Sequence, residues 1–363
     1  MNLFIDREEE LEFLNKRYHS LKAEFIVLYG RRRVGKSELI KQFVKDKSAI
    51  YFLATKTNTQ DQLQKFLQRV SSFFSEYPPQ INTWEACFDY LKKKAKTQTE
   101  KLIIVFDEFP YLISANNEIP SLFQMLWDEY LREENIFLIL TGSSISMMET
   151  EVLGSKSPLY GRRTAQIRLN PFKFKDVLKF YPHSKLEEVI PFYAVVGNLP
   201  LYLLEFEEKK TVFENIYQKI LLKKELLNAE AEFLLREELR DPSTYQSILE
   251  ALATTSTASD IAQKAHIEMH NLDKYLKVLL NLDLIQKESA LTKAKKNHYY
   301  IKDNFLDFWY KFCFPNASLR EEAPEQLLNQ FIKPNFNSWL GRKFESVCKE
   351  ALWELNRTKP AFF

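Results

Sequence analysis

The chain has 363 residues, of which 45% are hydrophobic and 28% are charged, and its formal net charge is +2. This length predicts two or three domains, and the composition excludes a disordered chain. The nearly balanced charge neither requires nor excludes a nucleic-acid partner, because a basic face can be hidden in a neutral average.

Three cysteines, Cys87, Cys313 and Cys348, lie far apart and predict neither a disulfide framework nor a zinc site. The acidic residues 8–10 stand where a secretory signal needs an apolar run. No stretch is long and uncharged enough to cross a bilayer. We therefore expect a cytoplasmic protein with no membrane partner.

The first predicted strand, residues 25–29, leads directly into the sequence GRRRVGKS, and a helical pattern follows. A G-x-x-x-x-G-K-S motif between a strand and a helix predicts a P-loop, whose backbone N–H groups surround phosphates. Lys36 supplies a cation for the β- and γ-phosphates, and the Ser37 hydroxyl is a predicted Mg²⁺ ligand. The predicted cofactors are therefore ATP and Mg²⁺. The predicted nucleotide-binding residues of this segment are Gly30, Arg31, Arg32, Arg33, Val34, Gly35, Lys36, Ser37 and Glu38.

A second strand is predicted at residues 49–53 and a third at residues 101–106, the latter followed by Asp107 and Glu108. An unbroken apolar run that ends in acids predicts a buried parallel strand of a P-loop protein. Asp107 is expected to hold Mg²⁺ through water, and Glu108 to deprotonate the attacking water. The strand inserted between the two motifs indicates the additional-strand class of P-loop ATPases.

The fourth predicted strand, residues 136–140, precedes Ser143 and Ser144. Either serine could sense the γ-phosphate beside Asp107, and the alternative is that it caps the next helix. Arg162 and Arg163 precede the fifth predicted strand, residues 165–169. Either arginine is a candidate for stabilising transition-state charge, and the alternative is a solvated or acid-paired side chain.

Taken together, these motifs resemble archaeal and bacterial ATPases related to the signalling (STAND-type) and AAA+ groups, which carry a nuclease-like (DUF234-type) region at the C-terminus. The resemblance covers nearly the whole chain. It rests on FIDREEEL at residues 4–11, YGRRRVGKS at 29–37, FDEFP at 106–110, TGSS at 141–144, SPLYGRRT at 157–164 and GNLPLYL at 197–203.

This resemblance implies roles that spacing does not give. It implies that Phe4, Ile5 and Arg7 lie beside the adenine, and that the motif of Gly197 and Pro200 belongs to a helical lid that faces the nucleotide. From the sequence alone, Pro200 is equally well explained as the first residue of a helix.

The second half of the chain is predicted to be mainly helical. Residues 185–196 and 212–227 read as lid helices, and three helices follow at about 243–254, 257–262 and 272–282. Two strands, 284–288 and 297–301, joined by residues 292–296, complete the predicted pattern of a winged helix. Residues 271–302 hold seven lysines and three acids, which favours contact with DNA phosphates. The alternative is a protein-contact module, because the third helix carries Asp273 and no arginine.

Residues 318–325 read as a polar linker, and the last helix resembles the opening of the family's nuclease-like region. Too few residues follow Glu345 to assemble a nuclease metal site, so no nuclease activity is expected. The predicted domains are a P-loop core (1–170), a helical lid (171–238), a winged helix (239–317) and a nuclease-like fragment (318–363). Two functions compete: an ATP-dependent switch that acts on duplex DNA, and a nucleotide-gated scaffold that binds a protein partner or further copies of itself.

Overall fold

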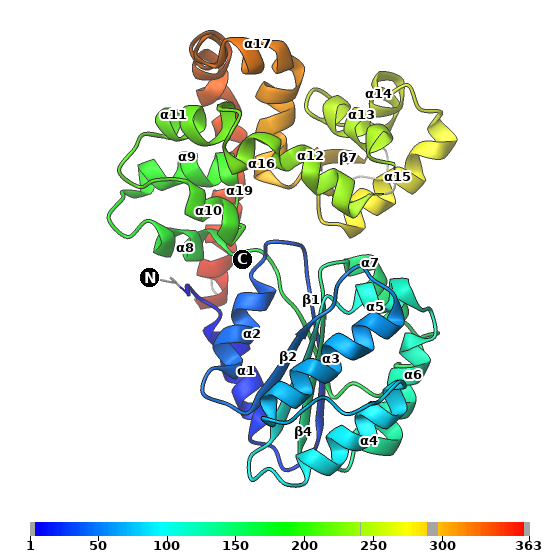
Figure 1. The fold of residues 1–363 in the computed structure, drawn as a ribbon. Helices are drawn as coiled ribbons and strands as arrows, with labels where there is room; N and C mark the ends of the chain where they lie inside the picture. Colours follow the sequence, from blue (N-terminus) through cyan, green and yellow to red (C-terminus); the bar gives the residue numbers. More distant parts are fainter. Residues whose placement is uncertain (1–3, 240, 289–296, 359–363) are drawn as a thin grey trace. The chain divides into compact units, whose positions relative to one another are not determined.

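The computed structural model describes residues 4–239, 241–288 and 297–358. The fold divides at the junction of Asn170 and Pro171 into two compact units (Figure 1). Within the described residues, no helix is long and apolar enough to span a bilayer.

The first unit is built on a sheet of five parallel strands in the order β2-β3-β4-β1-β5. The strands are β1 (Glu24–Tyr29), β2 (Ala49–Leu53), β3 (Leu102–Asp107), β4 (Ile136–Gly142) and β5 (Ala165–Arg168). The predicted five-stranded parallel sheet of the additional-strand class is confirmed, with β4 between β1 and β3. The strand predicted at residues 49–53 is β2, at the edge of the sheet. In this order the P-loop strand and the strand ending in Asp107 lie two positions apart, and their carboxyl ends share one edge of the sheet.

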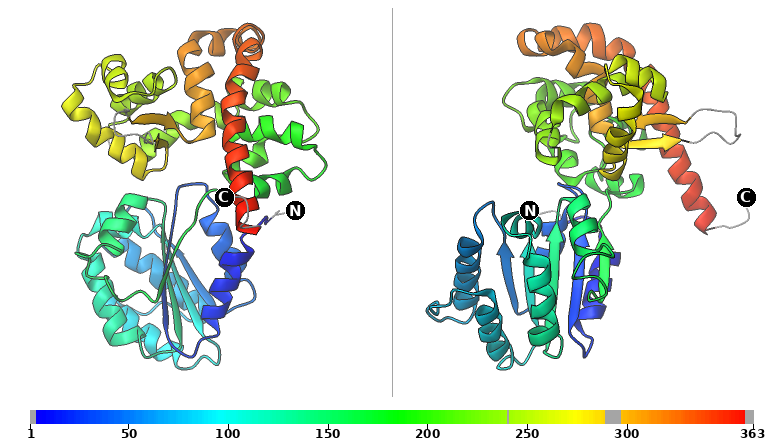
Figure 2. Two further views of the ribbon diagram at one scale, coloured as in Figure 1. Left: turned by 180° about the vertical axis from the view of Figure 1, so that it is seen from behind. Right: turned by 90° about the vertical axis from the view of Figure 1, so that its right-hand side faces the viewer.

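Helices cover both faces of this sheet, as the views in Figures 1 and 2 show. The helices of the first unit are α1 (Glu8–Tyr18), α2 (Lys36–Val44), α3 (Thr59–Phe73), α4 (Trp84–Ala95), α5 (Pro110–Ala115), α6 (Ile119–Leu126) and α7 (Ile145–Met147). Helices α6 and α7 continue into single π-helical segments, Trp127–Leu131 and Met148–Val152.

Aromatic side chains pack on each face of the sheet. Tyr18 of α1 and Phe43 of α2 contact Phe137 of β4 on one face. On the other face, Phe66 of α3 stands 4.7 Å from Phe106 of β3, measured between ring centroids. Strands β1, β3 and β4 are buried along their whole length, because helices cover them on both sides. This packing fixes the carboxyl edge of the sheet, where the predicted site residues lie.

The second unit is mainly helical. Its helices are α8 (Phe174–Val177), α9 (Leu186–Val196), α10 (Pro200–Glu205), α11 (Val212–Asn215), α12 (Leu226–Glu238), α13 (Pro242–Leu252), α14 (Ala258–Lys264), α15 (Met269–Asn281), α16 (Asn304–Phe308), α17 (Ala317–Glu322), α18 (Pro324–Leu327) and α19 (Lys333–Thr358). Strands β6 (Ile285–Glu288) and β7 (His298–Ile301) form an antiparallel pair after α15. Three helices followed by this pair reproduce the order of elements that the sequence predicts for residues 239–317.

Two predictions for the second half were wrong. Residues 318–325 are not a linker, because α17 and α18 occupy them and the side chain of Arg320 is buried. The helix predicted at residues 212–227 ends as a π-helical segment at Leu221, and α12 starts afresh at Leu226. Polarity alone misled the first prediction, since short helices can present polar faces to solvent. The predicted connection at residues 292–296 lies outside the described residues.

Candidate nucleotide site

The loop of residues 30–37 joins β1 to α2. Gly35 has a left-handed backbone (φ 95°, ψ 20°) immediately before α2, a conformation that costs glycine little. A Cβ atom on Gly30 would lie 2.3 Å from the carbonyl oxygen of Leu169, just after β5. The backbone therefore requires both glycines of the motif, one for its dihedral angles and the other for the close approach of the neighbouring chain.

Lys36 begins α2 and is 6% exposed. Its Nζ donates hydrogen bonds of 2.9 Å to the carbonyl oxygens of Gly30 and Arg31. Because both carbonyls belong to the same loop, the ammonium lies within the curve of that loop. The first-turn N–H groups of a helix have no acceptor inside the helix and favour an anion. A cation and a helix N-terminus are thus combined in one loop, which suits phosphate oxygens.

Asp107 ends β3 and is 2% exposed. Its Oδ2 accepts a 2.9 Å hydrogen bond from Ser37 Oγ and a second hydrogen bond from the hydroxyl of Tyr51. Its Oδ1 accepts a 3.0 Å hydrogen bond from the backbone N–H of Glu108. The two residues predicted to hold Mg²⁺ are therefore in direct contact. Hydroxyl and carboxylate oxygens are the ligands that Mg²⁺ prefers, so this donor set fits the ion.

Tyr51 of β2 is a site residue that sequence reasoning missed, because an aromatic residue in a strand is ordinary. Burial, and next the carboxylate of Asp107, raise the pKa of Tyr51 well above its usual value. The phenol therefore stays protonated and acts as the donor. A signal was present in the alternation of the strand: Ile50 and Phe52 are buried in the aromatic core, so residue 51 faces the opposite side of the sheet.

Glu108 follows Asp107 with a left-handed backbone (φ 53°), which is uncommon for a residue other than glycine. Ser143, 2% exposed after β4, holds the Glu108 carboxylate. Its Oγ lies 2.7 and 2.9 Å from the two carboxylate oxygens, and its backbone N–H donates at 3.3 Å. Between the two candidate serines, Ser143 contacts Glu108, whereas Ser144 takes the N-cap position of α7 without a side-chain cap hydrogen bond.

Arg7 lies against the P-loop. The guanidinium, 8% exposed, donates to the carbonyl oxygens of Val34 at 3.2 Å and Asn170 at 2.7 Å, and it pairs with Glu10 at 3.4 Å. These contacts make Arg7 a clamp on the loop backbone, a role that the sequence did not suggest. Phe4 is half-buried at the start of the described chain. Contact of Phe4 and Arg7 with an adenine stays a prediction.

The other residues of the loop have different surroundings. Arg32 donates a 3.3 Å hydrogen bond to the hydroxyl of Tyr111 in α5, which links the P-loop to the segment after Glu108. Arg31 and Val34 are buried, and Arg33 has a left-handed backbone (φ 66°). Glu38 pairs with Lys41 at 2.7 Å on an exposed face of α2. A phosphate contact by any of these side chains stays a prediction.

The backbone at Arg162 and Arg163 lies near the amino end of β1. Thr164, which follows them, is hydrogen-bonded to Phe25 at the amino end of β1, whereas the P-loop follows the carboxyl end of the same strand. Arg162 pairs with Asp128 at 3.0 Å, and Arg163 reaches the Leu153 carbonyl.

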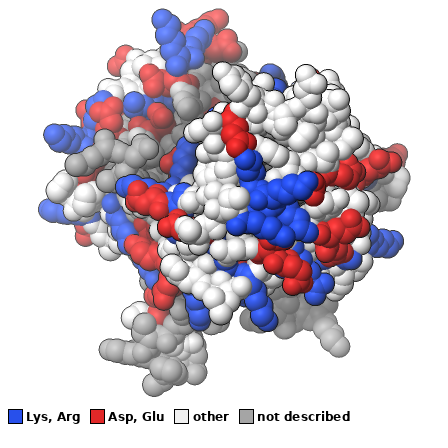
Figure 3. All heavy atoms as spheres, turned by 60° about the horizontal axis from the view of Figure 1, so that its bottom comes forward, with Lys and Arg blue, Asp and Glu red and all other residues white. Residues whose placement is uncertain are grey.

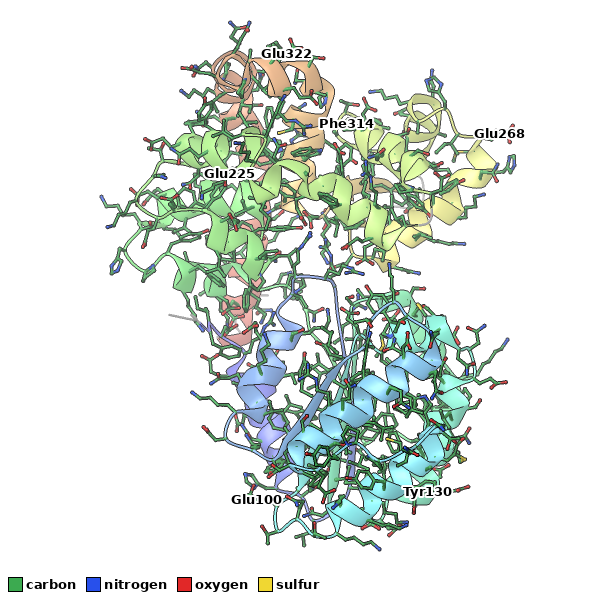
Figure 4. All side chains as sticks on the ribbon, in the orientation of Figure 1. Glu100, Tyr130, Glu225, Glu268, Phe314 and Glu322 are labelled. Atoms are coloured by element: carbon green, nitrogen blue, oxygen red, sulfur yellow. The ribbon has the colours of Figure 1, made fainter. Side chains whose placement is uncertain are left out.

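The six residues of β1 separate this end of the sheet from the P-loop by about 20 Å. Figure 4 marks the same end of the first unit with Glu100 and Tyr130, which precede β3 and β4. A contact of Arg162 or Arg163 with phosphate stays a prediction.

Pro200 is the first residue of α10, after Gly197, whose left-handed backbone (φ 74°) ends α9. The structure thus shows the helix-initiating role that the sequence allowed. Pro200 belongs to the second unit, so its contact with a nucleotide stays a prediction.

Comparison with known proteins identifies two matching families. A family described as an ATPase domain predominantly from Archaea matches residues 4–206. A second family, of archaeal and bacterial proteins of unknown function, matches residues 309–363. An uncharacterized protein of Methanocaldococcus jannaschii is 39% identical over 360 residues, which cover 98% of this chain and 78% of that protein.

Two solved structures share the fold. A Walker-type ATPase of Pyrococcus abyssi superposes with a TM-score of 0.63 at 22% identity, over 85% of this chain and 96% of that one. The ORC2 protein of Aeropyrum pernix, solved as ADPNP and ADP complexes, gives a TM-score of 0.58 at 16% identity, over 91% of this chain and 96% of that one. The ATPase family match covers the five-stranded sheet, the P-loop and the acidic motif at the end of β3. The chain therefore belongs to this archaeal ATPase family.

Proposed function

We propose that this ATPase-family chain hydrolyses ATP with Mg²⁺ at the carboxyl edge of the first unit's sheet. The observation that carries the proposal is the pairing of two carboxylates with two hydroxyls: Asp107 with Ser37 of the P-loop, and Glu108 with Ser143. The Asp107 carboxylate thus faces the P-loop, whereas the Glu108 carboxylate is held by Ser143. Different surroundings allow two adjacent acids to have two distinct roles.

Each role follows from the contacts of the residue. Lys36 binds the β- and γ-phosphates with its ammonium. Ser37 and Asp107 hold Mg²⁺, which neutralises negative charge on the phosphates when it is bound. Glu108 orients the attacking water and accepts its proton, because Asp107 is engaged with Ser37 and Tyr51. Ser143 orients the Glu108 carboxylate for that step.

The test is steady-state ATP hydrolysis together with nucleotide binding. Glu108→Gln keeps the size of the side chain and removes the base, so we expect turnover to fall roughly 10²- to 10⁴-fold while ATP remains bound. Lys36→Ala removes a charge-assisted contact to phosphate, so we expect ATP affinity to fall about 10- to 100-fold. Unchanged turnover in Glu108→Gln would move the base to another residue.

We further propose that residues 239–317 are a winged helix that contacts duplex DNA through α15 and the β6–β7 pair. The support is the observed order of three helices and an antiparallel pair, with Lys274 and Lys277 exposed on α15. If lysines contact phosphates, the logarithm of the binding constant falls linearly with the logarithm of the salt concentration. Filter binding that shows no salt-sensitive affinity for duplex DNA contradicts this part of the proposal.

The lysines at the end of α4 do not offer a competing DNA surface. Lys92 and Lys96 lie within 4.0 Å of Glu134, at 3.9 and 3.4 Å, and Lys93 pairs with Asp89 at 2.7 Å. Figure 3 shows lysine and arginine side chains beside acidic ones on the side at the bottom of Figure 1. Acids therefore neutralise this group of lysines locally.

The second candidate function is a nucleotide-gated scaffold for a protein partner. It is favoured by the pairing of charges around α15: Lys277 lies 3.8 Å from Asp273, and Lys302 pairs with Asp283. Lysines that already have acidic partners gain less from phosphates. Size measurement with and without ATP, on the purified chain alone, separates self-association from a monomeric switch.

A further inference from the structure

The Asp107 carboxylate accepts a hydrogen bond from Tyr51, which lies outside the two motifs of the site. Strand β2 pairs with β3 so that Tyr51 lies opposite Val105 and Leu53 lies opposite Asp107. The ring of Tyr51 therefore runs along the sheet toward the end of β3, and its hydroxyl reaches Asp107 Oδ2. The same oxygen accepts the hydrogen bond from Ser37 at 2.9 Å.

The shared oxygen has a consequence for the metal. A buried carboxylate is costly unless donors satisfy it. The Ser37 hydroxyl can ligate Mg²⁺ through an oxygen lone pair and still donate its hydrogen to Asp107. The phenol of Tyr51 is a second side-chain donor to Oδ2 and does not belong to the predicted metal ligands, while the Glu108 N–H holds Oδ1. Outer-shell donors of this kind orient the groups that hold a metal.

We propose that Tyr51 is a positioning residue that orients Asp107 for Mg²⁺, an inference that rests on the proposed function of the site. Tyr51 acts through Asp107 and has no role toward the phosphates themselves. Its hydroxyl, and not its ring, makes the contact that matters. The chemistry is that of a neutral phenol donating to a metal-binding carboxylate.

The test is Tyr51→Phe, which removes the hydroxyl and keeps the ring. Mg²⁺ is expected to raise the affinity for ATP, and the Mg²⁺ concentration that gives half of this gain is the quantity measured. We expect Tyr51→Phe to raise that concentration roughly 10-fold, which is the lower end of the effect of losing an outer-shell partner. Affinity for ATP in EDTA should stay as in the unaltered chain, because the phosphate loop is untouched. Binding is followed with a fluorescent ATP analogue in a Mg²⁺ titration, so the measurement does not depend on turnover.

Tyr90→Phe is the matched control. Tyr90 of α4 is half-buried and also donates its hydroxyl to a carboxylate in the first unit, that of the exposed Glu76 at 2.7 Å, but neither residue belongs to the nucleotide site. Its loss should leave both the EDTA affinity and the Mg²⁺ requirement unchanged.

The outcomes separate this inference from the proposed function. An unaltered chain whose ATP affinity ignores Mg²⁺ overturns the proposed metal site, and the role of Tyr51 with it. If the ATP affinity of the unaltered chain depends on Mg²⁺ and Tyr51→Phe needs the same Mg²⁺ concentration, the role of Tyr51 alone is overturned. Equal losses of affinity with Mg²⁺ and in EDTA would assign Tyr51 to packing of the sheet and also overturn the inference.

Discussion

At the scale of single residues, the site depends on keeping two adjacent carboxylates in different environments. Asp107 accepts its hydrogen bonds from Ser37, Tyr51 and the backbone, whereas the Glu108 side chain is held by Ser143. The left-handed backbone of Glu108 turns its side chain away from the direction of the strand. A conformation of this kind persists only where the surroundings hold it, and such positions concentrate at functional sites.

Ser143→Ala tests whether that positioning matters. The substitution removes the hydroxyl that lies 2.7 and 2.9 Å from the Glu108 oxygens and keeps the backbone contact. Because a hydrogen bond to a charged group contributes about 1.5–3 kcal/mol, we expect kcat to fall at least about 10-fold. ATP affinity should be unchanged. Both quantities are measured by steady-state kinetics and equilibrium binding.

Ser144→Ala is the neighbouring control, since the Ser144 side chain makes no cap hydrogen bond to α7. Its kcat should stay within about twofold of the unaltered chain. Equal losses in both variants would show that the loop after β4 matters as a whole, and that the Ser143 hydroxyl has no special part.

At the scale of elements, the packing of β5 against the P-loop leaves no room for a side chain at Gly30. In Gly30→Ala, the new Cβ would meet the Leu169 carbonyl at 2.3 Å, and backbone on both sides resists the shift. We expect lower stability and loss of ATP binding, measured by urea unfolding and by titration with ATP.

Gly341→Ala provides the opposite case within one chain. Gly341 lies inside the long helix α19, it is exposed, and a Cβ there would meet nothing within 4 Å. Replacing glycine by alanine inside an exposed helix stabilises it by about 0.5–1 kcal/mol. If both substitutions lowered the free energy of unfolding, the loss at Gly30 could not be assigned to the close approach of the Leu169 carbonyl.

The junction of α1 with the P-loop depends on Arg7. In Arg7→Ala, the carbonyl of Val34, in the P-loop, and that of Asn170 lose their guanidinium donor. An unsatisfied buried acceptor, here the Val34 carbonyl, costs about 1–3 kcal/mol, so we expect a lower free energy of unfolding in urea. Arg17→Ala, which removes an ion pair with Glu24 at the other end of α1, is the control, and a larger loss there would contradict the clamp.

The sequence predicted those parts of the site that belong to continuous motifs. Ser37 and Asp107 could be placed together because parallel strands bring their carboxyl ends to one edge. The alternation of β2 indicates which face Tyr51 is on, but its partner depends on which strand is the neighbour. The contacts of Arg7 depend on how α1 packs against the P-loop and Asn170. For Arg162 and Arg163 the sequence showed a place next to a strand, whereas their partners, Asp128 and the Leu153 carbonyl, come from segments that only folding brings near.

At the scale of the whole molecule, the segments predicted as separate domains in the second half pack into one unit. Asn304 of α16, just after the β6–β7 pair, donates a 3.0 Å hydrogen bond to the Tyr193 carbonyl in α9. Glu350 of α19 accepts a 2.7 Å hydrogen bond from the backbone N–H of Phe174 at the start of α8. The three-helix segment, the helices after Pro171 and the last helix are thus joined by specific contacts. These contacts agree with the division of the chain, in which Pro171–Phe363 forms one compact unit.

This continuity leads to a prediction about turnover. If α15 contacts DNA, duplex DNA should change the rate of ATP hydrolysis by the full chain, and the double variant Lys274→Ala/Lys277→Ala should lose that response. The same variant should reduce the slope of log affinity against log salt by about 2, since each phosphate contact contributes about 1. Lys223→Ala/Lys224→Ala removes two exposed lysines between α11 and α12 and should keep both the response and the slope. Duplex DNA could instead leave a low rate of hydrolysis unchanged, with no difference between the two double variants. That result would argue for the protein scaffold, because a partner other than DNA would then have to stimulate hydrolysis.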